Sequence, residues 1–211
     1  SLMKYIPVNR PLIKGNELNF VSDCIKSGWI SSDGSYIKKF EKKFAKLVSR
    51  KYAVSVSSGT AALDIAIKSI NIKKDDEVIV PAFTIISCLH QIVRQGGKPV
   101  LVDSDPLTWN IDVSKIEKKI SKKTKAIIIV HIYGLPVDIY PVIKIAKKYN
   151  LIIIEDAAEE LGQFYKNKPI GSYGHISTFS FFANKHITTG EGGMIVTNNR
   201  SLAQKFSILK N

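Results

Sequence analysis

The 211-residue chain has few of the residues that build disulfide or metal frameworks. It contains two cysteines, Cys24 and Cys88, and four histidines, and none of them falls at the spacing typical of a metal site. These counts exclude a small secreted fold held by disulfides, and no metal is expected. A reducing compartment, the cytoplasm, is the simplest expectation.

Long apolar runs are also absent. No run approaches the roughly 20 residues that a membrane-spanning helix requires, and the start of the chain lacks the apolar stretch of a secretory signal. We therefore expect no membrane association. Ser1 and Leu2 precede Met3 and are expected to be a remnant of expression engineering, so the fold is argued from Met3 onward.

Arginine is scarce in a strongly basic chain. The net charge is +13, yet the arginines are only Arg10, Arg50, Arg94 and Arg200. The lysines are scattered over the polar faces of helical patterns, and no basic run is interleaved with aromatics as in a base-stacking platform. We interpret the charge as solvated helix faces. A basic nucleic-acid-binding α/β domain, which would bind oligonucleotides in a salt-dependent manner, is the least favoured hypothesis.

Short apolar strands alternate with helical patterns along most of the chain. Strands are predicted over residues 52–56, 77–80, 99–102, 125–130, 151–155, 177–182 and 193–196. Helices are predicted over residues 16–27, from 35, and over 60–70, 84–95, 113–120, 138–149 and from 202. This order predicts a three-layer α/β/α fold with a mainly parallel, mixed sheet. We expect one large domain over residues 3–211, with an N-terminal helical arm over about 9–50 and a sheet core over about 51–211.

Polar and aromatic residues follow several of the predicted strands. Ligands of such sheets gather at the carboxyl ends of the strands. The residues that fall there are Ser57–Thr60, Phe83, His131, Asp156 and Lys185. Their convergence predicts a site at this edge.

Lys185 is the most informative of these residues, because it lies between a strand-like apolar run and the glycine-rich turn Gly190–Gly193. Pyridoxal 5'-phosphate (PLP) requires a lysine for its Schiff base, an acid facing its ring nitrogen and an anion site for its phosphate. Asp156, at the end of a buried strand, could be that acid. It could equally cap a following helix or pair with a lysine.

The other candidates also have two interpretations. Ser58, Gly59 and Thr60 start a helix, where free N–H groups favour a phosphate, but an ordinary N-cap is the commoner use of such residues. Glu159 could reach the cofactor or be a solvated helix residue. Phe83 could stack on the cofactor ring or belong to the core, and Ser180 could reach the phosphate or merely interrupt a strand. His131, His175 and His186 are interpreted as structural or supporting residues, and Gly190–Gly193 as a turn that returns the chain to the sheet.

The ordered motifs resemble the DegT-type sugar aminotransferases, PLP enzymes of the aspartate aminotransferase fold that act on nucleotide-linked keto sugars. The resemblance extends over nearly the whole chain, and the residues of the motifs are most similar to those of GDP-perosamine synthases. It rests on residues 58–63, 78–84, 130–134, 154–159, 179–185 and 190–193.

The resemblance implies a role for each matching position. Lys185 would form the Schiff base and shuttle the proton, Asp156 would hold the pyridinium, and Glu159 would lie beside the ring oxygen. The phosphate would be bound by Ser58, Gly59, Thr60 and Ser180, and Phe83 would stack on the ring. The implied reaction moves an amino group from glutamate to a 4-keto-6-deoxy nucleotide sugar, as in perosamine-like amino sugar synthesis for surface polysaccharide such as lipopolysaccharide O-antigen. The implied assembly is a homodimer with shared active sites.

Two further alternatives follow from the resemblance. One branch of the family carries histidine in place of the lysine and is a PLP-dependent sugar dehydratase, but the presence of Lys185 favours amino transfer. Family members also continue after Lys210–Asn211 into further active-site segments and a small C-terminal domain. The chain is therefore expected to be a fragment or a truncated form. A catalytically silent, PLP-binding or dimerising remnant is the second hypothesis.

Overall fold

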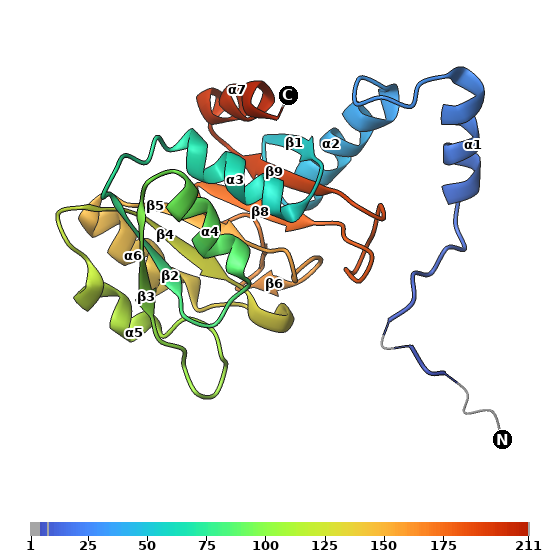
Figure 1. Cartoon of the computed structure of the whole chain (residues 1–211). Coiled ribbons are helices and arrows are strands. Elements are labelled where there is room, and N and C mark those ends of the chain that lie inside the picture. Colours follow the sequence, from blue (N-terminus) through green and yellow to red (C-terminus); the bar gives the residue numbers. More distant parts are fainter. Residues whose placement is uncertain (1–4, 8, 211) are drawn as a thin grey trace.

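The computed structural model describes residues 5–7 and 9–210 (Figure 1). Ser1, Leu2 and Asn211 lie outside this part of the chain. At the centre is a seven-stranded sheet with the strand order β1-β9-β8-β5-β4-β2-β3. The strands are β1 (Tyr52–Val56), β2 (Glu77–Pro81), β3 (Lys98–Val102), β4 (Thr124–Val130), β5 (Ile152–Asp156), β8 (Ile176–Ser180) and β9 (Gly193–Thr197).

The sheet is mainly parallel, as predicted. β3, β2, β4, β5 and β8 pair in parallel, whereas β9 runs antiparallel to both β8 and β1. Because β9 reverses the chain twice, β1 points in the same direction as β8. Six strands therefore end at one edge of the sheet, which is where ligands of such folds gather.

Helices cover both faces of the sheet, which confirms the three-layer prediction (Figure 1). Residues of α3, α4 and α7 share one buried cluster, and residues of α2, α5 and α6 share the other. The helices are α1 (Glu17–Ser27), α2 (Ser35–Leu47), α3 (Gly59–Ser69), α4 (Ile86–Arg94), α5 (Val113–Ile116), α6 (Ile139–Tyr149) and α7 (Arg200–Leu209), with short 3₁₀ turns η1 (Glu117–Lys119) and η2 (Ile132–Gly134).

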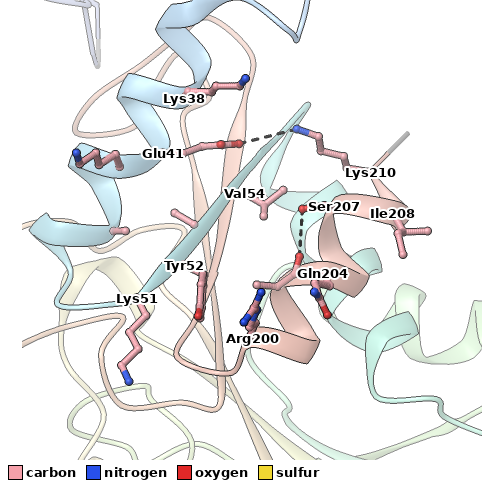
Figure 2. Close-up of a pocket in the computed structure, with 14 residues that line it drawn as sticks. Lys38, Glu41, Lys51, Tyr52, Val54, Arg200, Gln204, Ser207, Ile208 and Lys210 are labelled. Atoms are coloured by element: carbon pink, nitrogen blue, oxygen red, sulfur yellow. Dashed lines mark hydrogen bonds and ion pairs between the residues drawn. The ribbon is translucent and has the colours of Figure 1, made fainter.

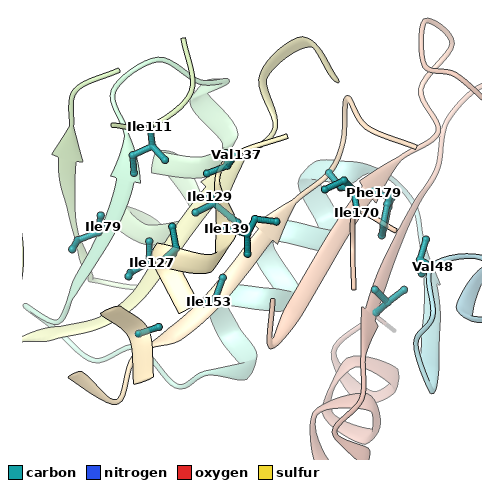
Figure 3. Packing of buried hydrophobic residues seen from close by; sticks show 14 of the residues in the cluster. Val48, Ile79, Ile111, Ile127, Ile129, Val137, Ile139, Ile153, Ile170 and Phe179 are labelled. Carbon is teal, nitrogen blue, oxygen red and sulfur yellow. The ribbon is translucent and has the colours of Figure 1, made fainter. Parts of the chain in front are cut away.

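Strand β4 shows why its sequence is apolar at every position. Successive side chains of a strand point to opposite faces. Ile127 and Ile129 accordingly pack with α6 residues such as Ile139 (Figure 3), whereas Ile128 packs with the cluster on the α3 side. Both faces exclude water, so β4 has no polar side.

The N-terminal helix α1 lies apart from the sheet (Figure 1) and buries none of its residues. It ends at Gly28, whose φ of 76° is the left-handed conformation that glycine adopts readily. Tyr36 of α2 holds α1 to α2, because its hydroxyl donates to Asp23 at 2.9 Å and its ring packs on Phe20. Within the described residues, no helix is both long enough and apolar enough to cross a membrane.

Several element boundaries differ from the predicted ones. The helix expected from residue 84 begins at Ile86, and the strand expected to reach residue 182 ends at Ser180, where the chain leaves the sheet. The hairpin of β6 (Phe164–Tyr165) and β7 (Lys168–Pro169) was not predicted, because two-residue strands are too short to show alternation. Its turn residues, Lys166 and Asn167, have φ of 43° and 67°.

Candidate functional site

Lys185 lies on the loop between β8 and β9, beside Glu159. Its Nζ is 3.9 Å from Glu159 Oε1, and the Lys185 side chain is 21% exposed. The second oxygen of Glu159 accepts the N–H of Tyr133 at 2.7 Å, which fixes the carboxylate against η2. All three residues line an open cavity of about 740 Å³. The structure thus brings the predicted amine and one predicted acid together.

The loop that carries Lys185 is fastened where it leaves and rejoins the sheet. The N–H of Thr189 donates to Phe181 O at 3.0 Å, and the N–H of Phe181 donates to Gly192 O at 2.9 Å. Gly192 has φ of 149°, and a Cβ there would collide with the Thr189 hydroxyl. The glycine-rich segment is therefore the predicted turn into β9, and it holds both ends of the lysine loop.

Asp156 ends β5 and is buried at 1% exposure. Its carboxylate accepts hydrogen bonds from the N–H of Ala158 at 3.0 Å, the Thr178 hydroxyl at 3.3 Å and the Cys88 thiol at 3.4 Å. All these donors are neutral, and no ion pair of Asp156 is formed within the described residues. Burial raises the pKa of Asp156, and these bonds offset the effect only in part. The carboxylate is therefore suited to a cationic partner.

Glu155, the neighbour of Asp156, was not singled out from the sequence, yet it has more hydrogen-bond partners. Its oxygens accept hydrogen bonds from a single loop and the start of β8: Gly171 N, Tyr173 N, Gly174 N and Ser177 Oγ. His131 Nδ1 accepts the N–H of Val137, so His131 Nε2 carries a proton and faces Glu155 Oε1 at 3.2 Å. The signal that could have found Glu155 is strand alternation, which places it and Asp156 on opposite faces.

A buried guanidinium completes the surroundings of Glu155. Arg50 Nη2 lies 3.8 Å from Glu155 Oε2 and donates to Gly174 O at 2.5 Å, while Arg50 Nε donates to Gly171 O at 2.6 Å. Burial alone would raise the pKa of Glu155, but the hydrogen bond from His131, with those from the loop N–H groups, lowers it to about 2. Glu155 is therefore an ionised structural anchor. This arrangement, with the bond from Ile153 N–H to His175 Nδ1, confirms structural roles for His131 and His175.

The start of α3 meets the end of β8. Ser58 caps the helix, its Oγ accepting the N–H of Ala61 at 3.0 Å. Its contact with a phosphate stays a prediction. A Cβ on Gly59 would lie 2.9 Å from the Ser180 Cβ, so only glycine permits this approach. The first N–H groups of a helix have no internal acceptor. Gly59 and Thr60 thus present N–H groups next to the Ser180 hydroxyl, which is an arrangement that binds anions.

Phe83 belongs to an exposed group of three aromatic rings. Its ring lies edge-on to Trp109, with centroids 5.5 Å apart, and to Tyr133, with centroids 6.4 Å apart. Trp109 and Tyr133 both have positive φ, of 62° and 49°, which is unfavourable for aromatic residues. The alternative that Phe83 is a core residue is wrong, because the side chain is 41% exposed.

Glu160 is a further acid that the sequence did not single out. It is 1% exposed, and neither carboxylate oxygen has a hydrogen-bond partner in the part of the chain that the structure describes. Burial raises its pKa to about 7, with a smaller opposing effect from His131. Its neighbour in space is Gly134, where a Cβ would lie 3.3 Å from Glu160 Oε2.

A separate hollow lies along the edge strand β1, between α2 and α7 (Figure 2). Its volume is about 860 Å³, and its lining includes Lys38, Lys51, Arg200 and Lys210. None of the predicted site residues lines it. Within residues 5–7 and 9–210, no group of three or more His, Cys, Asp or Glu side chains is arranged to hold a metal ion.

The sequence matches the model of the DegT/DnrJ/EryC1/StrS aminotransferase family over residues 11–211. The chain belongs to this family. It is 52% identical to a GDP-perosamine synthase of Escherichia coli O157:H7 over 200 residues, which are 95% of this chain and 55% of that protein. The family expected from the motifs is therefore confirmed.

Solved structures show the same fold. An aminotransferase from Psychrobacter cryohalolentis superposes with a TM-score of 0.88 at 37% identity, over 94% of this chain and 51% of the other. The GDP-4-keto-6-deoxy-D-mannose-3-dehydratase of E. coli, solved with bound hydrated PLP, gives a TM-score of 0.85 at 33% identity, over 93% and 53%. The chain spans about half the length of these relatives.

Proposed function

We propose that the chain is the cofactor-binding part of a PLP-dependent aminotransferase, which moves an amino group from glutamate to a 4-keto-6-deoxy nucleotide sugar. One observation carries the proposal. The strand ends that meet at one edge of the sheet carry a lysine amine, a buried carboxylate and a helix start with free N–H groups. Each of these is a group that PLP requires.

The residues fit this cofactor on their own chemistry. Asp156 is buried among neutral donors, and a protonated pyridine nitrogen would supply the positive charge that its carboxylate lacks. The start of α3, where Gly59 approaches Ser180 closely, has the free N–H groups and the hydroxyl that a phosphate prefers. Phe83 presents an exposed ring that could cover one face of the cofactor.

Each side chain then has a distinct task in the proposed reaction. Bound PLP supplies an electron sink for the electrons released at the amino-acid carbon. Lys185 Nζ would hold the cofactor, and its amine would move a proton at that carbon. Glu159, 3.9 Å from Nζ, keeps the amine oriented. Asp156 maintains the ring nitrogen in its protonated form.

The sugar substrate is inferred from the relatives. The E. coli O157:H7 relative is a GDP-perosamine synthase, which supports a GDP-linked 4-keto-6-deoxy sugar and a perosamine-like product for surface polysaccharide such as O-antigen. The dehydratase among the solved structures keeps the alternative of sugar dehydration open as a reaction class. Lys185 favours amino transfer, because its amine can carry the proton between carbon atoms.

The same proposal includes the cellular location, the oligomeric state and the domain organisation of the protein. We place the protein in the cytoplasm, as a homodimer with shared active sites, formed by a large domain with a helical arm over about 9–50 and a sheet core over about 51–211. The exposed apolar residues of α1, such as Leu18, Val21 and Ile25, support an interface in the assembled protein. The competing hypothesis is a catalytically silent remnant that binds PLP or dimerises without turnover.

The test is cofactor capture by the purified chain. PLP is added, the visible absorbance is recorded, and the mixture is reduced with borohydride before peptide mapping. We expect a reduced adduct on Lys185, its loss in Lys185→Ala, and its retention in the matched surface variant Lys168→Ala. An undiminished adduct in Lys185→Ala would refute the site. Glutamate added before reduction then separates the hypotheses: production of 2-oxoglutarate supports the aminotransferase, and an inert adduct supports the silent remnant.

A further inference from the structure

The N-terminal segment passes directly over the loop that carries Lys185. Asn9 Nδ2 donates to Asn184 O at 3.0 Å, joining positions 175 residues apart. Residues 9–13 line the same cavity of about 740 Å³ as Lys185 and Glu159. The segment therefore forms one wall of the candidate active site.

The cavity is lined by basic and acidic side chains, and one of the basic side chains has no acidic partner. Arg10, Glu17, Glu159, Lys185 and His186 line the cavity. Glu159 opposes Lys185 at 3.9 Å, and Glu17 Oε2 accepts the N–H of Gly15 at 2.7 Å, in the turn before α1. Arg10 forms no ion pair within the described residues. The remaining residues, 1–4, 8 and 211, include no Asp or Glu that could pair with it. Its guanidinium is thus the unmatched cation of the cavity.

The other arginines of the chain have different surroundings. Arg50 is buried against Glu155, Arg94 Nη1 lies 3.9 Å from Asp64, and Arg200 lines the separate hollow beside β1 (Figure 2). Lysine supplies most of the basic surface, so an arginine in this wall is notable. A guanidinium binds two phosphate oxygens at once through a planar fork, which an ammonium cannot do.

We propose that Arg10 binds the diphosphate of the nucleotide sugar, and that the segment of residues 9–13 is a strap which holds this substrate against Lys185. The inference rests on the proposed function, because it takes the cavity at Lys185 to be the sugar site. The start of α3, which is assigned to the cofactor phosphate, is a different anion site. The cavity volume is within the range of small-molecule sites, about 300–1,000 Å³.

Binding of GDP-mannose, a stable nucleotide sugar, tests the strap without requiring turnover. Affinity is measured by isothermal titration calorimetry with the purified chain in the presence of PLP. Arg10→Ala is expected to weaken binding by about 10- to 100-fold, the usual effect of removing one charged hydrogen-bonding partner. Arg10→Lys should lose less, because it retains the charge but not the fork. Asn9→Ala, which frees the strap from Asn184, should have a smaller effect than Arg10→Ala.

Arg200→Ala is the matched control, since it removes an exposed guanidinium from the other hollow. It should leave the affinity for GDP-mannose unchanged. Guanosine, which lacks phosphates, should bind Arg10→Ala and the parent chain equally. Equal affinity of Arg10→Ala and the parent chain for GDP-mannose, or no binding by the parent chain, would overturn the inference. The reduced adduct on Lys185 is read independently, so failure of the strap and failure of the cofactor site give different results.

Discussion

Glu155 and Asp156 are adjacent in sequence and equally buried, but their surroundings shift their pKa values in opposite directions. Glu155 accepts hydrogen bonds from Nε2–H of His131 and from the N–H groups of one loop, and these lower its pKa to about 2, with Arg50 at 3.8 Å beside it. Asp156 faces the thiol of Cys88 and other neutral donors, and its pKa rises. Consecutive strand residues point to opposite faces, so one strand end presents two different chemical environments.

The difference in pKa distinguishes a carboxylate that stabilises the fold from one that can bind a cofactor. A carboxylate with enough donors is locked as an anion and fixes the loops around it. A buried carboxylate with only neutral donors retains a capacity to bind a cation, which is what a cofactor with a pyridinium nitrogen needs. Glu160 is a third case, because it is buried and its carboxylate has no hydrogen-bond partner among the described residues. The three acids can be compared by removing each in turn.

The largest effect is expected from Glu155→Ala. The substitution leaves Arg50 buried without its anion and leaves several loop N–H groups unpaired, so unfolding should become easier by about 3–5 kcal/mol. Urea unfolding at pH 7, followed by circular dichroism, measures this difference. Glu117→Ala, at the exposed pair with Lys148, is the control and should change stability little, because solvent screens such a pair. A similarly small effect of Glu155→Ala would contradict the anchor.

The loss of stability at low pH should also depend on Glu155. Its pKa is lowered from 4.5 to about 2 in the folded chain, so the folded state holds the proton less tightly than the unfolded state. The resulting stability is present above about pH 4.5 and is lost as the pH falls towards 2. The shift corresponds to about 3 kcal/mol. Unfolding midpoints from pH 6 to 3 should fall steeply in the parent chain and less steeply in Glu155→Gln. Parallel profiles would contradict the assignment.

The sequence predicted one of these two environments and missed the other. Asp156 and Lys185 could be identified because strand ends and glycine turns leave local signals. The role of Glu155 depends on Arg50, which is 105 residues away in the chain, and on a loop after β5 whose N–H groups have no sequence signature. Long-range hydrogen bonds are made by the fold, so local patterns cannot predict them.

The same limit applies to the rest of the fold and site. The alternation of strands and helices, and with it the mainly parallel sheet, was predictable, but not the β6–β7 hairpin, whose strands are too short for periodicity. Phe83 was predicted at the site, whereas its contacts with Trp109 and Tyr133 depend on left-handed backbone conformations of non-glycine residues. Sequence patterns locate residues near a site, and packing decides which of them touch.

Glu160→Gln should have a smaller effect of opposite sign to that of Glu155. The pKa of Glu160 is raised from 4.5 to about 7, so the folded state binds its proton more tightly. That contribution to stability is complete below about pH 4.5 and is lost as the pH rises through 7. Glutamine does not ionise, so the variant should gain about 1–3 kcal/mol over the parent between pH 5 and pH 8.

Urea unfolding at pH 5 and pH 8 measures this gain for Glu160→Gln. The exposed residue Glu191 offers the control: Glu191→Gln removes the same charge from the surface and should give no comparable difference between the two pH values. If Glu160→Gln is no more stable than the parent chain at pH 8, Glu160 has a partner that keeps it ionised. That result would contradict its description as a buried acid without a hydrogen-bond partner.

Asp156→Asn should have the smallest effect on stability and the clearest effect on the cofactor. An amide keeps the shape and the acceptor for Ala158 N–H and the Thr178 hydroxyl, and it removes a charge that burial disfavours. Stability should therefore change by less than about 1 kcal/mol.

The neutral side chain of Asp156→Asn cannot hold a protonated ring nitrogen. PLP should therefore be retained at least about 10-fold less tightly, because an uncompensated loss of a charged hydrogen bond has at least this effect. Dialysis with absorbance detection measures retention, and urea unfolding measures stability. Loss of stability comparable to that of Glu155→Ala would show that Asp156 is a second structural anchor. Undiminished retention of PLP would show that the ring nitrogen does not face this carboxylate.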